Sequence, residues 1–430
     1  MKVALVYPEV CDLARFKEAR KEFPPFGVLY LAAILEESGI EVQVFKINGY
    51  NKKFDFRGFE VVGFSIPSSA TYDMVKETRF ESLYSDNRTV LVGGVHPSFY
   101  PEETLIDLQA DAVATGNSDK TIFDLVNAHD SRSFSQIAGL CFLSEGSIVK
   151  TPGLALDRSI DWLPLPARHL LEESDFIMAN RLAGTDTKMA HIMISRGCPF
   201  SCRFCAVQQK QIQYRSGYSV KAELEFLKRT YSIGGFAIVD DNFVINKNAI
   251  KDICLSIKDL GLRWSALSRV DTIDQELLEE MFDAGCIELK FGVESGSERM
   301  LRAMGKNISC NQIRRAITLA HSIGLRVKIF LVHGFPGEDQ SSTNETIALM
   351  KEIAPMVDRV SLFRFAPLPG SFVFKHAASF KLNIPERIVD WSKFHIHYNH
   401  YHWWGSDNDF ARLEIAYREL ESYISQNWKA

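Results

Sequence analysis

Three cysteines are crowded into residues 198–205 of this 430-residue chain. The segment Cys198-Pro-Phe-Ser-Cys202-Arg-Phe-Cys205 separates them by three and then two residues. Thiolates this close in one loop can converge on one metal centre. A structural zinc site normally takes four protein ligands, and no fourth is evident, because the other cysteines fall singly in expected helices or strands. The loop therefore predicts a metal centre with three protein ligands and one position left for a ligand from outside the protein.

The cysteine loop follows the first strand of a regular series. From Met189 onward, strand-like segments alternate with helix-like segments such as 220–230 and 274–284. The strand-like segments are 191–195, 235–239, 263–267, 287–292, 327–332 and 359–365. Six parallel βα units predict a partial (β/α)6 barrel over residues 189–375, open where an eightfold barrel would close.

The first part of the chain has an alternating series of its own. Strand-like segments lie at 3–7, 41–45, 61–65, 89–92 and 111–114. With helix-like segments between them, they predict a doubly wound, Rossmann-like parallel sheet over residues 1–135. Small residues follow three of these strands, at Ser65, Gly93, Gly94 and Gly116. Open α/β sheets bind ligands at such strand ends, so these four residues are candidate ligand contacts.

Two segments fall outside both series. Residues 136–188 contain a hairpin-like stretch at 139–151 and a proline-rich stretch that cannot be a helix interior, so we expect a linker there. Residues 376–430 form an aromatic and histidine-rich tail that becomes helical from Asp409. The predicted fold class is therefore α/β, with a Rossmann-like domain, a partial barrel and a short helical tail.

Charge and composition narrow the choice of partners. A net charge of -5 without a basic block argues against nucleic acid. No stretch has the length of a membrane span, and residues 1–8 are too short an apolar run for a signal peptide. Cysteines that cluster once and otherwise scatter do not suggest a disulfide framework. We therefore expect a cytoplasmic protein.

The cysteine loop, with Phe204 before its third cysteine, resembles that of the radical S-adenosylmethionine (SAM) superfamily. The resemblance implies that Cys198, Cys202 and Cys205 hold a [4Fe–4S] cluster whose remaining iron binds the amino and carboxylate groups of SAM. One electron from the reduced cluster then breaks the bond from the sulfonium to the 5′ carbon and yields a 5′-deoxyadenosyl radical. An electron donor such as flavodoxin or ferredoxin is an expected partner.

The same resemblance implies SAM contacts at the carboxyl ends of the later strands, where barrel chemistry belongs. Asp240 and Asp241 follow the second strand, where relatives meet the amino group of SAM. Arg269 follows the third strand, and Glu294 ends the fourth, placed to meet a ribose hydroxyl. Glu294 alone would equally suit the start of a surface helix. Further candidates in these motifs are Ser295, Gly334 and Pro336.

The first domain resembles the cobalamin-binding domain that precedes the barrel in one radical SAM class, through residues 24–33, 93–97 and 163–168. The resemblance implies cobalamin at the loops of Ser65, Gly93, Gly94 and Gly116. The Asp-x-His-x-x-Gly motif that supplies a histidine lower ligand is absent, as in most of that class. Residues 116–119 also depart from the acidic sequence usual there. The alternative is an empty scaffold, and His96 is expected to serve packing.

Three functions stay open at this stage. The first is methylation of an unreactive carbon of a small-molecule substrate, in which cobalamin carries the methyl group and SAM serves as methyl source and radical source. The second is a radical SAM reaction without methyl transfer, such as dehydration, cyclisation or carbon–carbon coupling. The third is a non-catalytic protein whose cysteines hold zinc.

The tail contains four closely spaced histidines, His395, His397, His400 and His402. Such a cluster could form a metal site or act as acid and base. Alternation at this spacing also fits an aromatic strand that acts as a lid, and we favour the lid.

Overall fold

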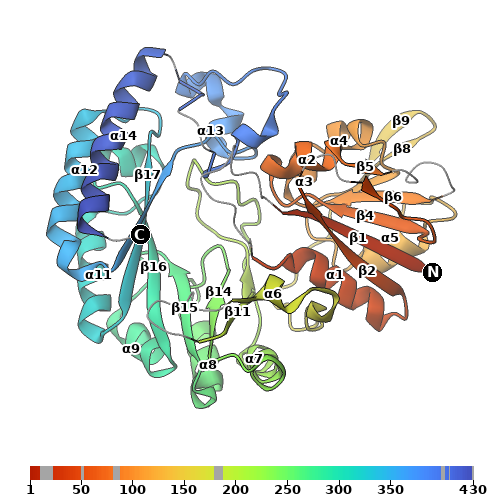
Figure 1. Cartoon of the computed structure of the whole chain (residues 1–430), viewed down its shortest axis with the longest axis horizontal. Helices are drawn as coiled ribbons and strands as arrows, with labels where there is room; N and C mark the ends of the chain where they lie inside the picture. The colour runs from red at the N-terminus through yellow and green to blue at the C-terminus, as the bar shows by residue number, and fades with distance from the viewer. Residues whose placement is uncertain are drawn as a thin grey trace. The chain divides into compact units, whose positions relative to one another are not determined.

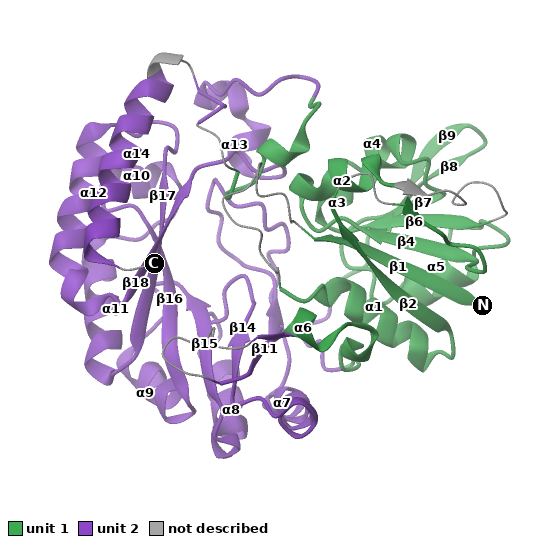
Figure 2. Ribbon diagram, viewed as in Figure 1, with its two compact units in different colours: residues 1–156, 162–176, 388–399 green, residues 157–161, 177–387, 400–430 purple. Residues whose placement is uncertain are grey.

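A computed structural model describes residues 1–9, 23–49, 53–80, 88–178, 187–398, 402–405 and 407–428. The chain divides into two compact units (Figure 2). The first contains residues 1–156, 162–176 and 388–399, and the second contains residues 157–161, 177–387 and 400–430. The segment predicted as one tail is therefore shared between the two units.

The first unit is built on a mainly parallel sheet with the strand order β2-β1-β4-β6-β7-β8-β9. The parallel strands are β1 (Lys2–Glu9), β2 (Glu41–Asn48), β4 (Val61–Ser65), β6 (Thr89–Gly93) and β7 (Ala112–Ala114). From β1 the chain pairs first on one side with β2 and then on the other with β4, so the direction of winding reverses between β1 and β4. This is the topological switch point of a doubly wound sheet, and the predicted Rossmann-like fold is confirmed.

The hairpin at residues 139–151 belongs to this sheet. Its strands β8 (Leu140–Ser144) and β9 (Ser147–Lys150) are antiparallel, and β8 pairs with β7. The predicted linker, which began at residue 136, left this hairpin outside the sheet and was wrong on this point. The pairing covers the edge of β7, which would otherwise present unpaired backbone groups.

Short helices complete the first unit, together with the two-stranded pair of β3 (Lys53–Phe54) and β5 (Arg79–Phe80). The helices are α1 (Phe26–Glu37), α2 (Tyr72–Glu77), α3 (Val95–Phe99), α4 (Pro101–Asp107), α5 (Ile122–Asn127) and α6 (Glu173–Phe176). Leu29 and Leu35 of α1 are fully buried. Helix α1 is therefore a core element of this unit.

The second unit is built on a sheet with the order β10-β11-β14-β15-β16-β17-β18. Its strands are β10 (Ile177–Met178), β11 (Met189–Ile192), β14 (Gly235–Ile238), β15 (Arg263–Ser268), β16 (Cys286–Glu294), β17 (Arg326–His333) and β18 (Arg359–Arg364). All pair in parallel except β10, which adds an antiparallel edge. The six parallel strands match the six predicted segments, and the partial barrel is confirmed.

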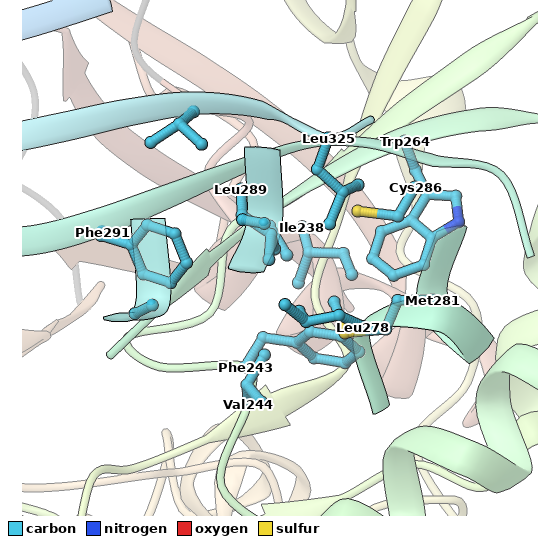
Figure 3. Packing of buried hydrophobic residues seen from close by; sticks show 14 of the residues in the cluster. Ile238, Phe243, Val244, Trp264, Leu278, Met281, Cys286, Leu289, Phe291 and Leu325 are labelled. Atoms are coloured by element: carbon cyan, nitrogen blue, oxygen red, sulfur yellow. The ribbon is translucent and has the colours of Figure 1, made fainter. Parts of the chain in front are cut away.

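Helices cover one face of this sheet (Figure 1). They are α7 (Gly217–Tyr231), α8 (Lys247–Ile257), α9 (Gln275–Asp283), α10 (Glu298–Ala303), α11 (Cys310–Ile323), α12 (Gln340–Ile353) and α14 (Asp407–Asn427). The short helix α13 (Phe372–Lys375) lies apart from this layer, where the N–H of Val373 donates to the carbonyl of Arg203. Trp264, Leu289 and Phe291 point into the core between sheet and helices (Figure 3). The side chains between them in sequence project to the opposite face, which we call the inner face. None of the helices in the described part of the chain is long and apolar enough to cross a membrane.

The tail is not the strand that its histidine spacing favours. Residues 391–393 form a 3-10 turn, and residues 394–397 are bends and turns, so the predicted lid strand is wrong for them. Trp391 packs against Tyr72, His96 and Tyr100 of the first unit, with ring centroids 4.7–6.1 Å apart. This aromatic packing outweighs the alternating pattern. His400 lies outside the described residues.

Candidate active site

The cysteine loop is held in shape at its base. Strands β12 (Ser195–Arg196) and β13 (Gln213–Tyr214) pair antiparallel and bracket the loop. The backbone N–H of Cys198 donates to the carbonyl of Gln209 at 2.9 Å. Gly197 has a φ of +91°, and a Cβ there would stand 2.5 Å from the carbonyl oxygen of Gln211. The loop therefore closes tightly next to its first cysteine.

The three thiols are half-buried and unbridged. Burial raises the pKa of Cys198, and it raises the pKa of Cys205 to about 11. Iron binds thiolate, so a cation near these sulfurs would help to hold the deprotonated form. Arg269 supplies one, with its Nη1 3.6 Å from Cys202 Sγ.

Arg269 is held beside Cys202 Sγ by ion-pair, hydrogen-bond and stacking contacts. Its guanidinium forms a bidentate ion pair with Asp271 at 2.8 and 2.9 Å and donates to the carbonyl of Lys306 at 2.8 Å. It also stacks on the ring of Phe200, 3.8 Å from the centroid. Arg269 was predicted to contact SAM, whereas these contacts tie it to the cysteine loop.

Among the described residues, no three His, Cys, Asp or Glu side chains are close enough together to bind a single metal ion. A [4Fe–4S] cluster does not require this, because each cysteine binds a different iron. Three sulfur donors in one tied loop, with a guanidinium beside one of them, suit a cluster of this kind. Cys198, Cys202 and Cys205 are the residues that would hold it.

Asp240 and Asp241, the two carboxyl residues after β14, differ in burial and in hydrogen bonding. Asp240 is buried and accepts hydrogen bonds from the backbone N–H groups of Ile194 and Ser195 at 2.9 and 2.7 Å and from Ser195 Oγ at 2.6 Å. Burial nevertheless raises its pKa to about 7. Asp240, a predicted SAM contact, thus joins the end of β14 to the end of β11. Asp241 keeps solvent access, although the surrounding protein desolvates it enough to raise its pKa.

Asn242 is the residue of this motif with unused hydrogen-bonding capacity. Its side-chain Nδ2 and Oδ1 are both buried, and neither has a partner among the described residues. Unpaired buried amides cost free energy, so such a group suggests a missing polar ligand. The amide of Asn242, with the Asp241 carboxyl next to it in sequence, fits the amino acid part of SAM.

Glu294 ends β16 in a strained conformation, with a φ of 65° just after a register shift in the strand. Its Oε1 accepts from the ammonium of Lys306 at 2.8 Å, and both side chains are buried. A Cβ on Gly292 would stand 2.5 Å from Glu294 Oε1 and 2.8 Å from Lys306 Nζ. This pair therefore lies directly over Gly292. Lys306 belongs to none of the motifs recognised in the sequence.

The remaining predicted SAM contacts are placed as follows. Ser295 Oγ is buried 3.2 Å from Thr346 Oγ1 of α12 and accepts from the N–H of Ser297, so it serves the helix side of the sheet. Gly334 donates its N–H to Glu338 at 2.8 Å and has a φ of +94°. A Cβ there would stand 2.3 Å from His402 Nε2. Pro336, two residues further on, is half-exposed.

The described tail histidines are divided between the two units. His395 and His397 belong to the first unit, and His402 belongs to the second, where its ring lies 6.0 Å from that of His333. Burial lowers the pKa of His402 to about 4 and that of His333 to about 3. Both rings are therefore neutral at pH 7, which suits packing behind the Gly334 loop.

Asp241 can be tested without disturbing the fold, because no hydrogen bond from the described residues ties its carboxylate. We expect Asp241→Asn to weaken SAM binding about tenfold, as loss of one charge-assisted hydrogen bond does. The exposed Asp259→Asn serves as control. Equilibrium binding of SAM to the reconstituted protein measures the effect. Equal affinity in all three proteins would contradict the placement of SAM at this motif.

In the first unit, the predicted contact residues lie at the carboxyl ends of neighbouring strands. Ser65 ends β4 and Gly93 ends β6, and these residues are paired in register. Ser98 Oγ donates to the carbonyl of Gly94 at 2.7 Å and accepts from the N–H of Gly116 at 2.9 Å. Gly116 is exposed, with no atom within 4 Å of the place of a Cβ. Small residues therefore stand at three neighbouring strand ends, with open space at Gly116.

Gly94 is required where it stands. It has a φ of +111°, and a Cβ would stand 2.6 Å from the carbonyl oxygen of Ile66. The N–H of Ile66 donates in turn to the carbonyl of Gly93 at 2.8 Å. The loops after β4 and β6 therefore meet backbone to backbone at Gly94.

His96 is a packing residue in this structure. It is fully buried, its Nδ1 lies 2.9 Å from Ser69 Oγ, and its ring lies 4.2 Å from Tyr72 and 5.3 Å from Tyr100. Burial lowers its pKa to about 3. These surroundings agree with the expectation that His96 is no metal ligand.

Comparison with known proteins bears on both units. Residues 192–350 match the family model of the radical SAM superfamily, and residues 14–126 match that of the B12 binding domain. An uncharacterised methyltransferase of Pyrococcus horikoshii is 30% identical over 410 residues, which cover 92% of this chain and 86% of the relative. The chain belongs to the radical SAM superfamily. It is therefore a radical SAM enzyme, and the [4Fe–4S] cluster, SAM and cobalamin expected from the sequence are the cofactors of its two families.

Other relatives of this radical SAM enzyme are more distant. The cytidylyl-2-hydroxyethylphosphonate methyltransferase of Streptomyces wedmorensis is 25% identical, and the match spans 81% of this chain and 76% of that relative. The anaerobic magnesium-protoporphyrin IX monomethyl ester cyclase of Rubrivivax gelatinosus is 24% identical, with coverage of 92% and 72%. The radical SAM methyltransferase TsrM of Kitasatospora setae, solved with cobalamin and a [4Fe–4S] cluster, has a TM-score of 0.71 at 15% identity, with coverage of 98% and 89%. That similarity shows a shared fold.

Proposed function

We propose that this enzyme methylates an unactivated carbon of a small-molecule substrate, with cobalamin as methyl carrier. One observation carries the proposal: a single chain joins a B12-binding sheet to a barrel with a three-cysteine loop, and a relative called a methyltransferase matches it through both parts. The structure of TsrM with tryptophan supports a small molecule as the substrate class. A one-electron donor such as flavodoxin or ferredoxin completes the proposed system.

In this proposal, separate residues of the chain hold the cluster, bind SAM and orient its ribose. Cys198, Cys202 and Cys205 hold the cluster, with Arg269 beside the second sulfur. Asn242 hydrogen bonds the amino acid part of SAM, and the Glu294–Lys306 pair orients its ribose. When bound, the reduced cluster supplies the electron that cleaves SAM, and cobalamin supplies the methyl group. The inner face of the barrel keeps water from the reacting carbon.

Cobalamin bound at the loops of Ser65, Gly94 and Gly116 would have no histidine lower ligand in this proposal. His96 is the histidine of these loops, and its ring is enclosed by Tyr72 and Trp391. His96 would therefore keep its packing role, and the loops of Ser65, Gly94 and Gly116 would hold the group that supplies the methyl.

A non-methylating reaction is the second candidate, favoured by one observation. The cyclase of Rubrivivax gelatinosus matches 92% of this chain, and its name describes ring closure. The two candidates share the cysteine loop and the SAM residues. They differ in whether a methyl group reaches the product.

Cobalamin binding tests the proposal directly. Protein refolded with hydroxocobalamin should retain cobalt in a 1:1 ratio, and Gly94→Ala should abolish this, because the new Cβ would push the loop after β4 away from that after β6. Gly58→Ala is the matched control, since Gly58 also has a positive φ but has open space around it. Cobalt analysis and the visible spectrum give the readout. Wild-type protein without cobalt would remove the methylation mechanism and leave the second candidate.

A further inference from the structure

Three positively charged side chains lie side by side on the inner face of the second sheet. Lys290 of β16 pairs in register with Lys328 of β17, and Lys328 pairs with Arg359 of β18. Residues paired in this way project to the same face of the sheet. Their sequence neighbours Leu289 and Val327 are buried in the core beneath the helices. We call Lys290, Lys328 and Arg359 the cationic row.

The cationic row is accessible. Its three residues are half-buried, and along β17 half-exposed residues on the inner face alternate with buried residues on the helix side. The interior of a complete eightfold barrel is instead packed with bulky apolar side chains. The inner-face residues of β17 and β18 are therefore only partly covered by the described chain.

The described part of the inner face carries less negative charge than positive charge. Glu288 lies beside the cationic row, and one of its oxygens pairs with the guanidinium of Arg359. Its other oxygen is 3.9 Å from Lys290 Nζ. Arg326, at the start of β17, has its own partner in Asp358. The neighbouring inner-face residues are uncharged: Ser265, Leu267, Phe330 and Ser361.

Two donors in the cationic row are poorly satisfied. Arg359 Nε is buried and has no acceptor among the described residues. Among the described residues, the polar contact of Lys290 Nζ is the long one to Glu288, and desolvation lowers the pKa of Lys290. A buried donor without an acceptor costs free energy. An oxyanion between Lys290 and Arg359 would remove this cost.

Glu288 compensates only part of the charge of the cationic row. Like charges directly opposite each other on adjacent strands destabilise a sheet, and partial burial strengthens the repulsion. Apolar side chains would pack there at lower cost. Cationic side chains held together at a ligand-binding face are, by contrast, how proteins recognise carboxylates and phosphoryl groups.

We infer that the substrate of this enzyme carries an oxyanion, a carboxylate or phosphoryl group, which binds Lys290 and Arg359 on the inner face of the barrel. The inference rests on the proposed function in one respect, that the bound anion is the substrate. Gly292 lies two residues beyond Lys290 on β16, beneath the Glu294–Lys306 pair. Two residues of a strand span about 7 Å. The anion therefore binds one layer of side chains below the proposed ribose site, and the reacting carbon points toward SAM.

Simple anions test the site without knowledge of the substrate. We would titrate acetate and methylphosphonate into the reconstituted enzyme, saturated with SAM so that its own carboxylate is in place, and follow binding by calorimetry. Acetamide is the neutral control ligand. The variants are Lys290→Met, which removes one cation, and Glu288→Gln, which removes the competing carboxylate but keeps an acceptor for Arg359. Lys258→Met, at an exposed lysine on the helix side, is the control variant.

We expect at least one anion to bind the wild type and Lys258→Met equally, and acetamide not to bind. Lys290→Met should weaken binding about tenfold, and Glu288→Gln should strengthen it severalfold. The tighter of the two anions identifies the group. No anion binding, or equal affinities in wild type, Lys290→Met and Glu288→Gln, would overturn the inference. SAM cleavage is assayed separately, so failed anion binding with normal coproducts counts against this inference, whereas normal anion binding without coproducts counts against the proposed function.

Discussion

Replacement of Cys198, Cys202 and Cys205 together by alanine should leave a folded protein that contains no bound iron or sulfide. The three thiols lie in a loop outside the buried core clusters, and the backbone hydrogen bonds at the base of the loop do not involve them. Removal of all three protein ligands leaves no sulfur donor in that loop for a cluster. We therefore expect complete loss of the visible absorbance of the cluster and of SAM cleavage.

The control for this variant replaces three cysteines elsewhere, Cys141, Cys254 and Cys310, which are buried singly. That protein should keep a full complement of iron and sulfide. Iron and acid-labile sulfide analysis after anaerobic reconstitution compares the two. Wild-type levels in the variant of residues 198, 202 and 205 would show that the cluster is held elsewhere.

The largest loss of stability is expected at an ion pair behind the cysteine loop. Arg215, directly after β13, pairs with Glu223 of α7, and both side chains are almost fully buried. Arg215 also donates to the carbonyl of Met193 at 3.1 Å and so fixes the end of β11. Glu223→Ala leaves a buried guanidinium without its counter-charge, which typically costs about 3–5 kcal/mol.

Chemical denaturation of the cluster-free protein measures this loss. Glu225→Ala, two residues along the same helix but exposed, should change the free energy of unfolding by less than about 0.5 kcal/mol. A similar small change in Glu223→Ala would mean that the buried pair does not support the base of the loop.

The parts of the fold predicted from sequence are those set by local pattern. Strand and helix periodicity along residues 189–375 repeats six times, so the barrel was predictable without knowledge of distant contacts. The cysteine loop was equally predictable, because its three cysteines lie close together in the sequence, between residues 198 and 205. The inward direction of Lys290 could also have been predicted, since charged and apolar residues alternate along β16 and β17.

Other features depend on contacts between distant residues. Lys306 reaches Glu294 from beyond α10, and nothing in the sequence around Lys306 marks it. The sequence of the β8–β9 hairpin does not show that β8 pairs with β7, so the hairpin was assigned to a linker. Ser295 follows Glu294 in the chain but faces Thr346 of α12, because the chain leaves β16 at Glu294 with a positive φ. Motif matching assigned both residues to the ligand, whereas the backbone at the end of β16 separates them.

We expect methyl transfer to depend on both the [4Fe–4S] cluster and cobalamin. The small molecules formed from SAM test this most directly. The enzyme, reconstituted anaerobically with its cluster and cobalamin, is incubated with SAM labelled in the methyl group, a strong reductant and a small-molecule extract of cells, and the products are followed by mass spectrometry. We expect S-adenosylhomocysteine and 5′-deoxyadenosine in equal amounts, together with a compound that has gained the labelled methyl group. Formation of 5′-deoxyadenosine without S-adenosylhomocysteine or a labelled product would contradict methyl transfer.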